Sequence, residues 1–439
     1  MKAAQNFAYY LIGLVISPFI TFLVAIRYFD INQKRYGKII FVGFTALFGV
    51  FIILPENYDG FRHAMNVSVH YLDLDFFSFL IEAKDLLLFR NVDGANDELF
   101  LHFISYFVGL FGGSVSLFFG IVSTIYSYFY FGSIIKVYEY LPKKRSFLIT
   151  GLFILFVLWK SLEGMNTVGT WVAFWVFFNG AFSYFKTKNK KYLILIVSSC
   201  FIHTSFFLFT LAFWIFYFFG NRPKLYLTIL ILSYAVKVFT PSIEFTDKIF
   251  TYTELGQAKY KVYSLKDEAK SKKYFEKHDA KQEKQSFHKL FYAYTTNLFA
   301  QVLFFLLVFR YSYWSKKINN FMVNGFMCIA VLIWSFGNIF NFIPAILNRG
   351  MIVSGIFILT SSIILISHEK RNKLNFGLKA NNLFKVFKVI LLPIIIILVV
   401  FHKTSAISSF LNFKLLFSPL LSPIIDDISF KDVLIMNFK

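Results

Sequence analysis

The hydrophobic residues of this chain fall into continuous runs, which are separated by short, mostly basic polar turns. Several runs approach the roughly 20 residues that an α-helix needs to cross a bilayer. They lack the period-two alternation of β-barrel strands. The pattern therefore predicts an all-α fold, a polytopic integral membrane helical bundle of about 10–12 transmembrane segments, two of them partial or re-entrant.

Ten full spans are expected from the positions of these runs. In chain order they are residues 8–26, 39–54, 114–135, 147–159, 168–185, 225–239, 290–310, 321–342, 350–367 and 389–401. We expect a tight outer turn at residues 343–349 between two of them. The assignment keeps the basic turns on the cytoplasmic side.

Two further apolar segments do not fit a full pass. Residues 98–112 are short and carry His102, so we interpret them as re-entrant or interfacial. Residues 192–219 are too long for one pass and too short for two. Two half-membrane helices that meet at His203 would keep the flanking basic turns on one side of the membrane.

The remaining polar segments are expected outside the cytoplasm. They are the loops 55–98 and 240–288 and the C-terminal tail 403–439. Residues 70–89 have apolar positions at helical spacing and are predicted to lie along the membrane surface. In the second loop, the spacing of Asp279 and Glu283 to nearby lysines predicts a solvated helix. Residues 1–439 are interpreted as a single membrane domain.

Composition strengthens the membrane assignment and removes other classes of function. The chain is 57% hydrophobic and 21% aromatic, with a mean hydropathy of +0.61. Its net charge of +21 would suit nucleic acid, but the cations lie in short turns, as the positive-inside rule predicts, and we expect no nucleic-acid partner. Cys200 and Cys328 lie in apolar runs and are interpreted as small buried hydrophobes. Spacings typical of metal sites, nucleotide loops or nucleophile elbows are missing, so no metal or cofactor is expected. The one pair of acids at carboxylate-pair spacing, Asp73 and Asp75, is interpreted as solvated.

Polar residues accumulate where the predicted spans reach the outer side. Singly, each has an ordinary explanation as an interfacial anchor or a helix–helix hydrogen bond. Together they predict a polar cavity open to the outside, with two arginines available for an anionic group. The residues are Asn57, Tyr58, Asp59, Arg62, His63, Glu163, Asn166, His203, Thr204, Ser205, Asn338, Asn341, Asn348 and Arg349.

Several short motifs resemble the EpsG/Wzy-type polysaccharide polymerases. The matching segments are Gly164-Met165-Asn166, Val172-Ala173, the lysine-rich turn after that span, Ile202-His203-Thr204-Ser205, Tyr58-Asp59-Gly60-Phe61-Arg62-His63, Asn96-Asp97-Glu98-Leu99-Phe100 and Arg349. The resemblance covers roughly residues 1–370. The chain departs from the family pattern at Gly169, where an arginine is usual.

The resemblance implies a function at the outer face of the bacterial cytoplasmic (inner) membrane. Such an enzyme polymerises undecaprenyl-diphosphate-linked oligosaccharide repeat units into O-antigen, capsule or exopolysaccharide. It is a membrane glycosyltransferase that needs no metal and no nucleotide, since its donor is already activated. The partners implied are the lipid-linked oligosaccharide, membrane lipids, and a chain-length regulator and a flippase of the same pathway.

Such a reaction needs a base for the acceptor hydroxyl and cations for the diphosphate leaving group. The candidates for the base are His203, Asp59 and Glu163. Arg62 and Arg349 are the candidates for the diphosphate. The remaining substrate-binding candidates are Asn166, Tyr58, His63 and Thr204.

Two other functions stay open at this point. A lipid-linked oligosaccharide flippase would show two similar halves of full spans, and the chain has no internal repeat. A membrane acyltransferase that modifies surface glycans also uses a histidine in or near the membrane. The extended outer loops favour the polymerase.

Overall fold

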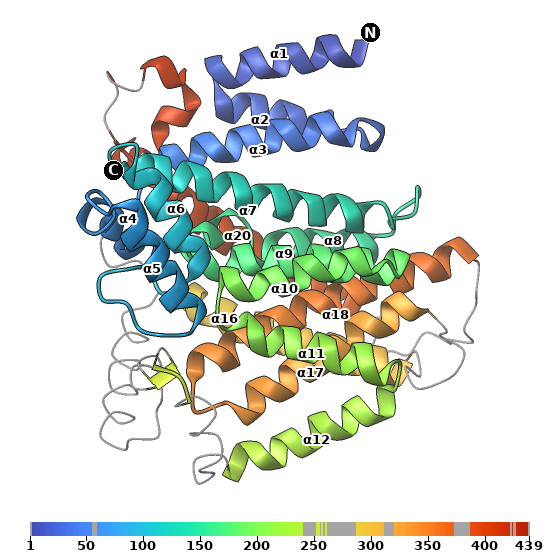
Figure 1. Ribbon diagram of the computed structural model, residues 1–439. Coiled ribbons are helices and arrows are strands. Elements are labelled where there is room, and N and C mark those ends of the chain that lie inside the picture. Colours follow the sequence, from blue (N-terminus) through green and yellow to red (C-terminus); the bar gives the residue numbers. More distant parts are fainter. Residues whose placement is uncertain are drawn as a thin grey trace.

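The computed structural model describes residues 2–54, 59–239, 252–254, 256–257, 260, 287–310, 320–372, 387–421, 424 and 427–437. The structure is 81% helical, and the described residues contain no strand, which confirms the all-α prediction. Most of the long helices lie side by side in one bundle (Figure 1). Most of the loop predicted at 240–288, including Asp279 and Glu283, lies outside the described residues.

The helices are bounded as follows. The α-helices are α1 (Lys2–Ile16), α2 (Pro18–Arg27), α3 (Lys34–Val50), α4 (Asp59–Val69), α5 (Phe76–Leu87), α6 (Leu99–Gly109), α7 (Val115–Tyr138), α8 (Phe147–Trp159), α9 (Val168–Thr187), α10 (Leu193–Ile202), α11 (Phe206–Phe219), α12 (Pro223–Phe239), α16 (Phe287–Arg310), α17 (Phe321–Ile339), α18 (Pro344–Asn372), α20 (Leu392–Phe410) and α21 (Phe430–Asn437). The short 3₁₀ or π turns are η1 (Ile31–Gln33), η2 (Leu162–Asn166), η3 (Lys190–Tyr192), η5 (Phe387–Leu391), η6 (Phe413–Leu416) and η7 (Pro419–Leu421).

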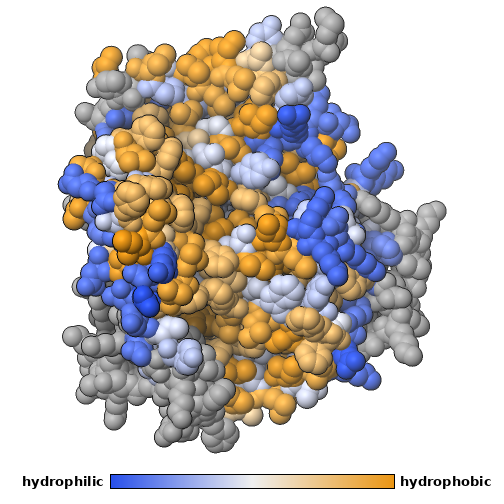
Figure 2. Space-filling model, viewed as in Figure 1, coloured by the Kyte–Doolittle hydropathy of each residue, from blue (hydrophilic) through white to orange (hydrophobic). Residues whose placement is uncertain are grey.

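The surface of the bundle carries apolar residues of the kind that contact a bilayer. Figure 2 shows a hydrophobic band on the face in view, with hydrophilic margins on either side of it. In the described residues, five helical segments are long and apolar enough to cross a membrane: Val115–Tyr138, Phe147–Asn166, Phe321–Ile339, Pro344–His368 and Phe387–Phe410. The chain is therefore a helical membrane protein.

The centre of the bundle is α9, whose side chains are nearly all buried. Phe178 stacks on Phe326 of α17 and on Phe357 of α18, with ring centroids 5.8 and 5.7 Å apart. On another side, Trp175 packs against Tyr130 of α7 at 5.0 Å. This aromatic packing fixes the position of the first turn of α9, which lies beside the candidate site described below.

The first predicted span, residues 8–26, is wrong. The chain breaks at Ser17, which is extended (φ −154°), and Pro18 starts a second helix. Pro suits the first helical position because its missing N–H is not needed there. α1 and α2 fold against each other, since a side chain added at Gly13 would meet Thr21. Each helix is too short to cross a bilayer alone.

α3 and α7 pack antiparallel and unusually closely. At one end Lys34 pairs with Glu139, at 2.5 Å between Nζ and Oε1. Towards the other end Gly49 lies directly against α7, where a Cβ would collide with the carbonyl oxygen of Phe119 and with Ser123. A glycine is therefore required at this crossing, as in other close-packed membrane helices.

Substituting Gly49 with alanine is expected to destabilise the bundle. The methyl group would meet backbone and force α3 away from α7, at about 1–3 kcal/mol. Gly132→Ala, on α7, is the matched control, because the nearest atoms to its Cβ, on Asn179 and Lys38, would lie 3.4 Å away. Thermal unfolding followed by size-exclusion chromatography in detergent should show a lower midpoint for Gly49→Ala alone. Equal midpoints would contradict the close α3–α7 crossing.

The loop predicted at residues 55–98 holds two helices. α5 lies within the stretch 70–89, where helical spacing predicted it, and Asp75 caps it by accepting hydrogen bonds from the backbone N–H groups of Phe77 and Ser78. α4 was missed because its sequence, DGFRHAMNVSV, is largely polar. α6 has 11 residues, or about 16 Å, and is too short for a full pass.

The predicted break at His203 is present. α10 ends at Ile202, His203 is extended (φ −153°), and α11 begins at Phe206. The two helices turn back on each other, since Thr210 Oγ1 lies 3.4 Å from the carbonyl oxygen of Ile196.

Two predictions in the second half of the chain are wrong. Residues 343–349 are not a turn: Pro344 begins α18, so Arg349 lies in a helix. The tail does not begin at residue 403, because α20 continues to Phe410 and buries Lys403. In both cases a polar residue near the predicted end of a span has a partner within the bundle. Arg349 lies beside His203, and Lys403 pairs with Glu163.

Candidate functional site

A cavity of about 290 Å³ lies where α4, the start of α6, the α10–α11 corner and the first turns of α18 meet. Polar and charged side chains dominate one part of its wall. They are Asp59, Arg62, His63, Asp97, Glu98, His203, Thr204, Ser205, Thr253, Tyr260 and Arg349. Apolar side chains, including Phe89, Phe207 and Ile346, complete it.

The structure brings six of the nine predicted site residues to this cavity: Asp59, Arg62, His63, His203, Thr204 and Arg349. They come from three segments of the chain that are far apart in sequence. Tyr58 lies outside the described residues. Glu163 and Asn166 do not line the cavity.

One wall is built by the first turn of α4. Asp59, Arg62 and His63 stand at positions i, i+3 and i+4, so they share one face of the helix. Asp59 Oδ1 accepts a hydrogen bond from Arg62 at 2.9 Å, and Asp59 Oδ2 lies 3.7 Å from His63 Nε2. When His63 is protonated, its Nε2–H interacts with the Asp59 carboxylate, and this interaction, together with the charges of Arg62 and Arg349, lowers the pKa of Asp59 to about 2.

The tautomer of His63 follows from its hydrogen-bond partner Asn96. Asn96 Nδ2 donates to Ser105 at 2.8 Å, so Asn96 Oδ1 is the acceptor that faces His63 Nδ1 at 2.6 Å. His63 therefore carries a proton on Nδ1, and in its neutral form Nε2 holds the lone pair on the side of Asp59. Burial lowers the pKa of His63, but the carboxylates of Asp59 and Glu98 outweigh it and raise the pKa above 6.5.

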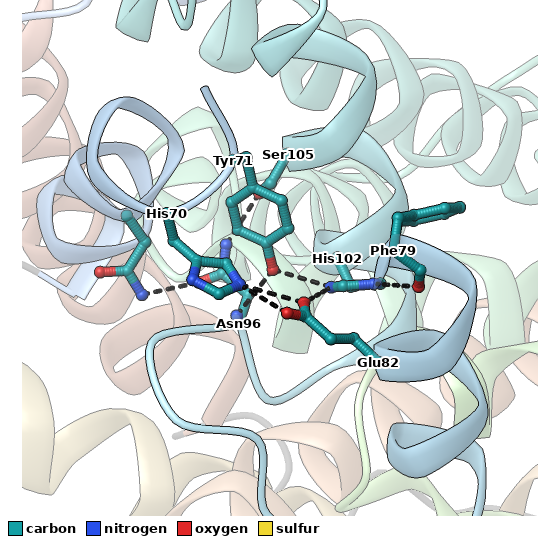
Figure 3. Close-up of polar contacts among 8 residues, drawn as sticks. His70, Tyr71, Phe79, Glu82, Asn96, His102 and Ser105 are labelled. Atoms are coloured by element: carbon teal, nitrogen blue, oxygen red, sulfur yellow. Dashed lines mark hydrogen bonds and ion pairs between the residues drawn. The ribbon is translucent and has the colours of Figure 1, made fainter. Parts of the chain in front are cut away.

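Asn96 is itself held by a buried network that Figure 3 shows. Its backbone N–H donates to the Tyr71 hydroxyl at 2.9 Å, and that hydroxyl meets His102 Nδ1 at 2.9 Å. His102 Nε2 faces the carbonyl oxygen of Phe79 at 3.2 Å and must donate to it, so Tyr71 donates to Nδ1. Burial raises the pKa of Tyr71 and keeps it protonated. These three contacts hold the backbone of Asn96, whose side-chain amide orients His63.

The same figure shows where this network ends. His70 Nε2 lies 3.0 Å from Glu82 Oε2, which in turn is 3.9 Å from His102 Nδ1. These groups lie behind the cavity and do not line it. We assign them to the support of α4, α5 and α6.

His203 is the opposite tautomer, with its proton on Nε2. At the α10–α11 corner, the backbone N–H of Ser205 donates to His203 Nδ1 at 3.1 Å, and the Ser205 hydroxyl lies 2.9 Å from the same atom. Because a backbone N–H only donates, Nδ1 is the acceptor and Nε2 carries the proton. The lone pair of His203 is therefore occupied, which makes His63 the better placed base.

Two N–H groups lie next to each other here, one on Arg349 and one on His203 itself. Arg349 Nη1 lies 3.2 Å from His203 Nε2, and both groups carry protons. Glu98 Oε1 is 3.7 Å from the same ring nitrogen. An oxygen anion that lies beside the pair and bridges the two N–H groups would satisfy both donors. In the protein Glu98 lies closest to this role, and a phosphate oxygen suits the same place.

Because Gly169 has no side chain, the α10–α11 corner can pack closely against the first turn of α9. A Cβ on this first-turn residue of α9 would lie 3.2 Å from His203 Cδ2 and 3.3 Å from the carbonyl oxygen of Ile202. The space that an arginine would need is filled by the corner itself. Arg349 supplies a guanidinium beside the same histidine from α18 instead.

Glu163 was predicted as a base, and the structure gives it a different place. Its carboxylate forms a buried ion pair with Lys403 of α20 and a hydrogen bond with Ser161. Lys403 is 3% exposed. Asn166, in the same turn η2, packs its backbone oxygen beneath Gly60 of α4. Both residues join segments of the chain at the C-terminal end of α8.

Neutralising one partner of the Glu163–Lys403 pair is expected to destabilise the protein. Glu163→Gln leaves a buried ammonium without its counter-charge, at about 3–5 kcal/mol. The double variant Glu163→Gln, Lys403→Met removes both charges and should recover most of that loss. Thermal unfolding in detergent measures both. A catalytic Glu163 would instead leave stability unchanged and abolish activity in both variants.

The sequence did not point to Thr253 and Tyr260 in the cavity wall, nor to the site roles of Asn96, Asp97 and Glu98. The last three adjoin one another in the sequence. Their segment was singled out as an acidic start of an apolar helix, but their side chains were not assigned to the site. Among the described residues, no group of three His, Cys, Asp or Glu side chains is arranged to hold a metal ion. Searches against family models, curated proteins and solved structures found no match to this chain.

Proposed function

We propose that this protein is a polysaccharide repeat-unit polymerase of the bacterial cytoplasmic membrane. The observation that carries the proposal is the pairing, in one cavity, of a convergent donor pair for an oxygen anion with an oriented histidine–carboxylate pair. The donors are Arg349 and His203, 3.2 Å apart. The histidine–carboxylate pair is His63 and Asp59. The resemblance of the surrounding motifs to the EpsG/Wzy-type polymerases supports the same function.

The donor pair suits the leaving group. A glycosyl bond to a lipid diphosphate breaks with negative charge accumulating on the phosphate oxygens. Arg349 and the Nε2–H of His203 stabilise that charge, and Arg62 adds a second guanidinium at the mouth. Arg62 is 61% exposed, so its guanidinium is accessible to a substrate that enters the cavity.

The histidine–carboxylate pair suits the acceptor. The sugar hydroxyl of the acceptor gives its proton to His63 Nε2 while its oxygen bonds to the anomeric carbon of the donor. The carbon–oxygen bond to the diphosphate breaks, and the lipid diphosphate leaves with the electron pair. Asp59 stabilises the imidazolium formed, and Asn96 keeps Nδ1 protonated so that Nε2 is the basic atom.

The side of the membrane follows from the charge of the turns. The cavity lies at the end of the bundle that carries α4 and α5, whereas Lys34, Glu139 and Lys186 cluster at the other end of α7. The basic turns next to that cluster belong in the cytoplasm by the positive-inside rule. The cavity then faces outward, where lipid-linked repeat units are displayed.

Deletion of the gene in its own host tests the proposal. A strain without this protein should still display single repeat units on its surface lipid but no long chains, because assembly and export of the unit are intact. Expression of the wild-type chain should restore the ladder. A deletion strain that displays no repeat unit at all would indicate an earlier step, such as flipping. Unchanged chain lengths would exclude a polymerase.

A further inference from the structure

A second, larger cavity of about 630 Å³ lies elsewhere in the bundle, between α2, α3, α7, α8 and α20. Its wall is almost entirely apolar, with many phenylalanine side chains, among them Phe41, Phe44 and Phe131. Nothing in the proposed reaction uses it. Its chemistry is that of a site for a hydrocarbon chain.

The cavity is at least as long as one leaflet is thick, because its lining reaches from Arg145, before α8, to Leu162, after it. Along α3 its lining runs from Gly37 to Phe48, which are 11 residues apart. At 1.5 Å per residue this is about 16 Å. Half of a hydrocarbon core of about 30 Å is about 15 Å. One acyl chain of one leaflet therefore fits along it.

One end of the cavity is cationic. Arg27, in the last turn of α2, and Arg145, just before α8, both line it and are both exposed. They lie at the same end, because Arg145 sits 4.4 Å above the ring of Tyr138, which packs edge-on against Phe29 at 6.0 Å. Two guanidinium groups at the head of an apolar channel complement an anionic headgroup.

That end is opposite to the candidate active site. The Lys34–Glu139 ion pair marks the end of α3 and α7 where Arg27 and Arg145 lie. Gly60 of α4, which carries the site, packs against Asn166 and Phe119, near the other end of α7. A lipid-linked substrate whose diphosphate occupies the first cavity cannot place the same diphosphate between these two arginines.

We propose that this cavity is a binding site for an anionic phospholipid of the leaflet that faces the basic turns. One acyl chain fills the channel, and the headgroup phosphate lies between Arg27 and Arg145. The bound lipid contacts α2, α3, α7 and α8 and so fills the space that their side chains leave open. The inference does not depend on the proposed polymerase activity.

Lipid retention tests the site. The protein is reconstituted in nanodiscs of equal parts phosphatidylglycerol and phosphatidylethanolamine, extracted in mild detergent, and weighed by native mass spectrometry. Wild type should keep one phosphatidylglycerol and exclude phosphatidylethanolamine. Each arginine contributes about a fivefold preference, so Arg27→Gln with Arg145→Gln should lower retention about 25-fold. Lys143→Gln with Lys144→Gln is the matched control, since these exposed lysines adjoin Arg145 but do not line the cavity.

A second variant tests the channel apart from the charge. Ala25→Trp fills the α2 wall of the cavity while both arginines remain. It should also lose phosphatidylglycerol, with its helical circular dichroism and elution volume unchanged. Equal retention by wild type and the double arginine variant would overturn the proposal, as would loss in the lysine control, equal binding of phosphatidylethanolamine, or displacement of phosphatidylglycerol by added undecaprenyl phosphate.

Discussion

Replacing Arg349 with alanine is expected to abolish long-chain polysaccharide while single repeat units are still displayed. Arg349 stands 3.2 Å from His203 Nε2 and forms half of the donor pair that we assign to the leaving diphosphate. Removing one preorganised donor from such a site lowers the rate by about 100- to 1,000-fold. Gel analysis of surface polysaccharide, with a membrane blot for the protein, measures both outcomes.

The control for this prediction compares two other arginines. Arg62 and Arg90 each pair with an aspartate at the surface, at 2.9 and 3.0 Å, and their side chains are 61% and 55% exposed. Only Arg62 lines the cavity. Arg62→Ala should therefore shorten the chains, and Arg90→Ala should not. Normal chain lengths in Arg349→Ala at wild-type protein levels would show that Arg349 does not stabilise the leaving diphosphate.

The second large effect concerns His63. His63→Gln is expected to lower the rate of polymerisation by about 100- to 10,000-fold, the usual contribution of a positioned base. His203→Gln removes the donor on the opposite wall and serves as the comparison. A base is lost in the first case and an anion contact in the second. Only His63→Gln should therefore remove the dependence of the rate on pH below neutrality.

Asp59 gives the sign of that pH dependence. His63 acts as a base when neutral, so the rate should rise with pH through the pKa of His63, which lies above 6.5. In Asp59→Asn the carboxylate that stabilises the imidazolium is gone while burial remains, so the pKa of His63 falls. The acidic limb should then move to lower pH. A limb that stays in place would show that another group titrates.

Much of the fold could be predicted because continuous apolar runs leave few alternatives to membrane helices. α8 matches its predicted range of 147–159 at both ends, and the break at His203 follows from a run of unsuitable length between two basic turns. Ser17-Pro18 was one exception, because the residues on both sides are apolar and only the backbone geometry at Pro18 divides the run.

The sequence predicted which residues lie at the candidate site better than it predicted what each of them could do. Asp59, Arg62 and His63 are polar residues next to a span, which is a visible signal. The roles that we propose for His63 and His203 depend on Asn96 and Ser205, whose hydrogen bonds fix the two ring tautomers and exist only after folding. The pairing of Glu163 with Lys403 could not be predicted, because the two residues lie 240 positions apart in the sequence.

The central claim is that this cavity joins lipid-linked repeat units. The most direct measurement incubates the purified protein in liposomes with its host's undecaprenyl-diphosphate-linked repeat unit and follows product length by gel electrophoresis and mass spectrometry. We predict oligomers that grow by whole repeat units, release of undecaprenyl diphosphate in equal number to the bonds formed, and neither with Arg349→Ala. Substrate that remains monomeric with the correctly folded wild-type protein would contradict the account.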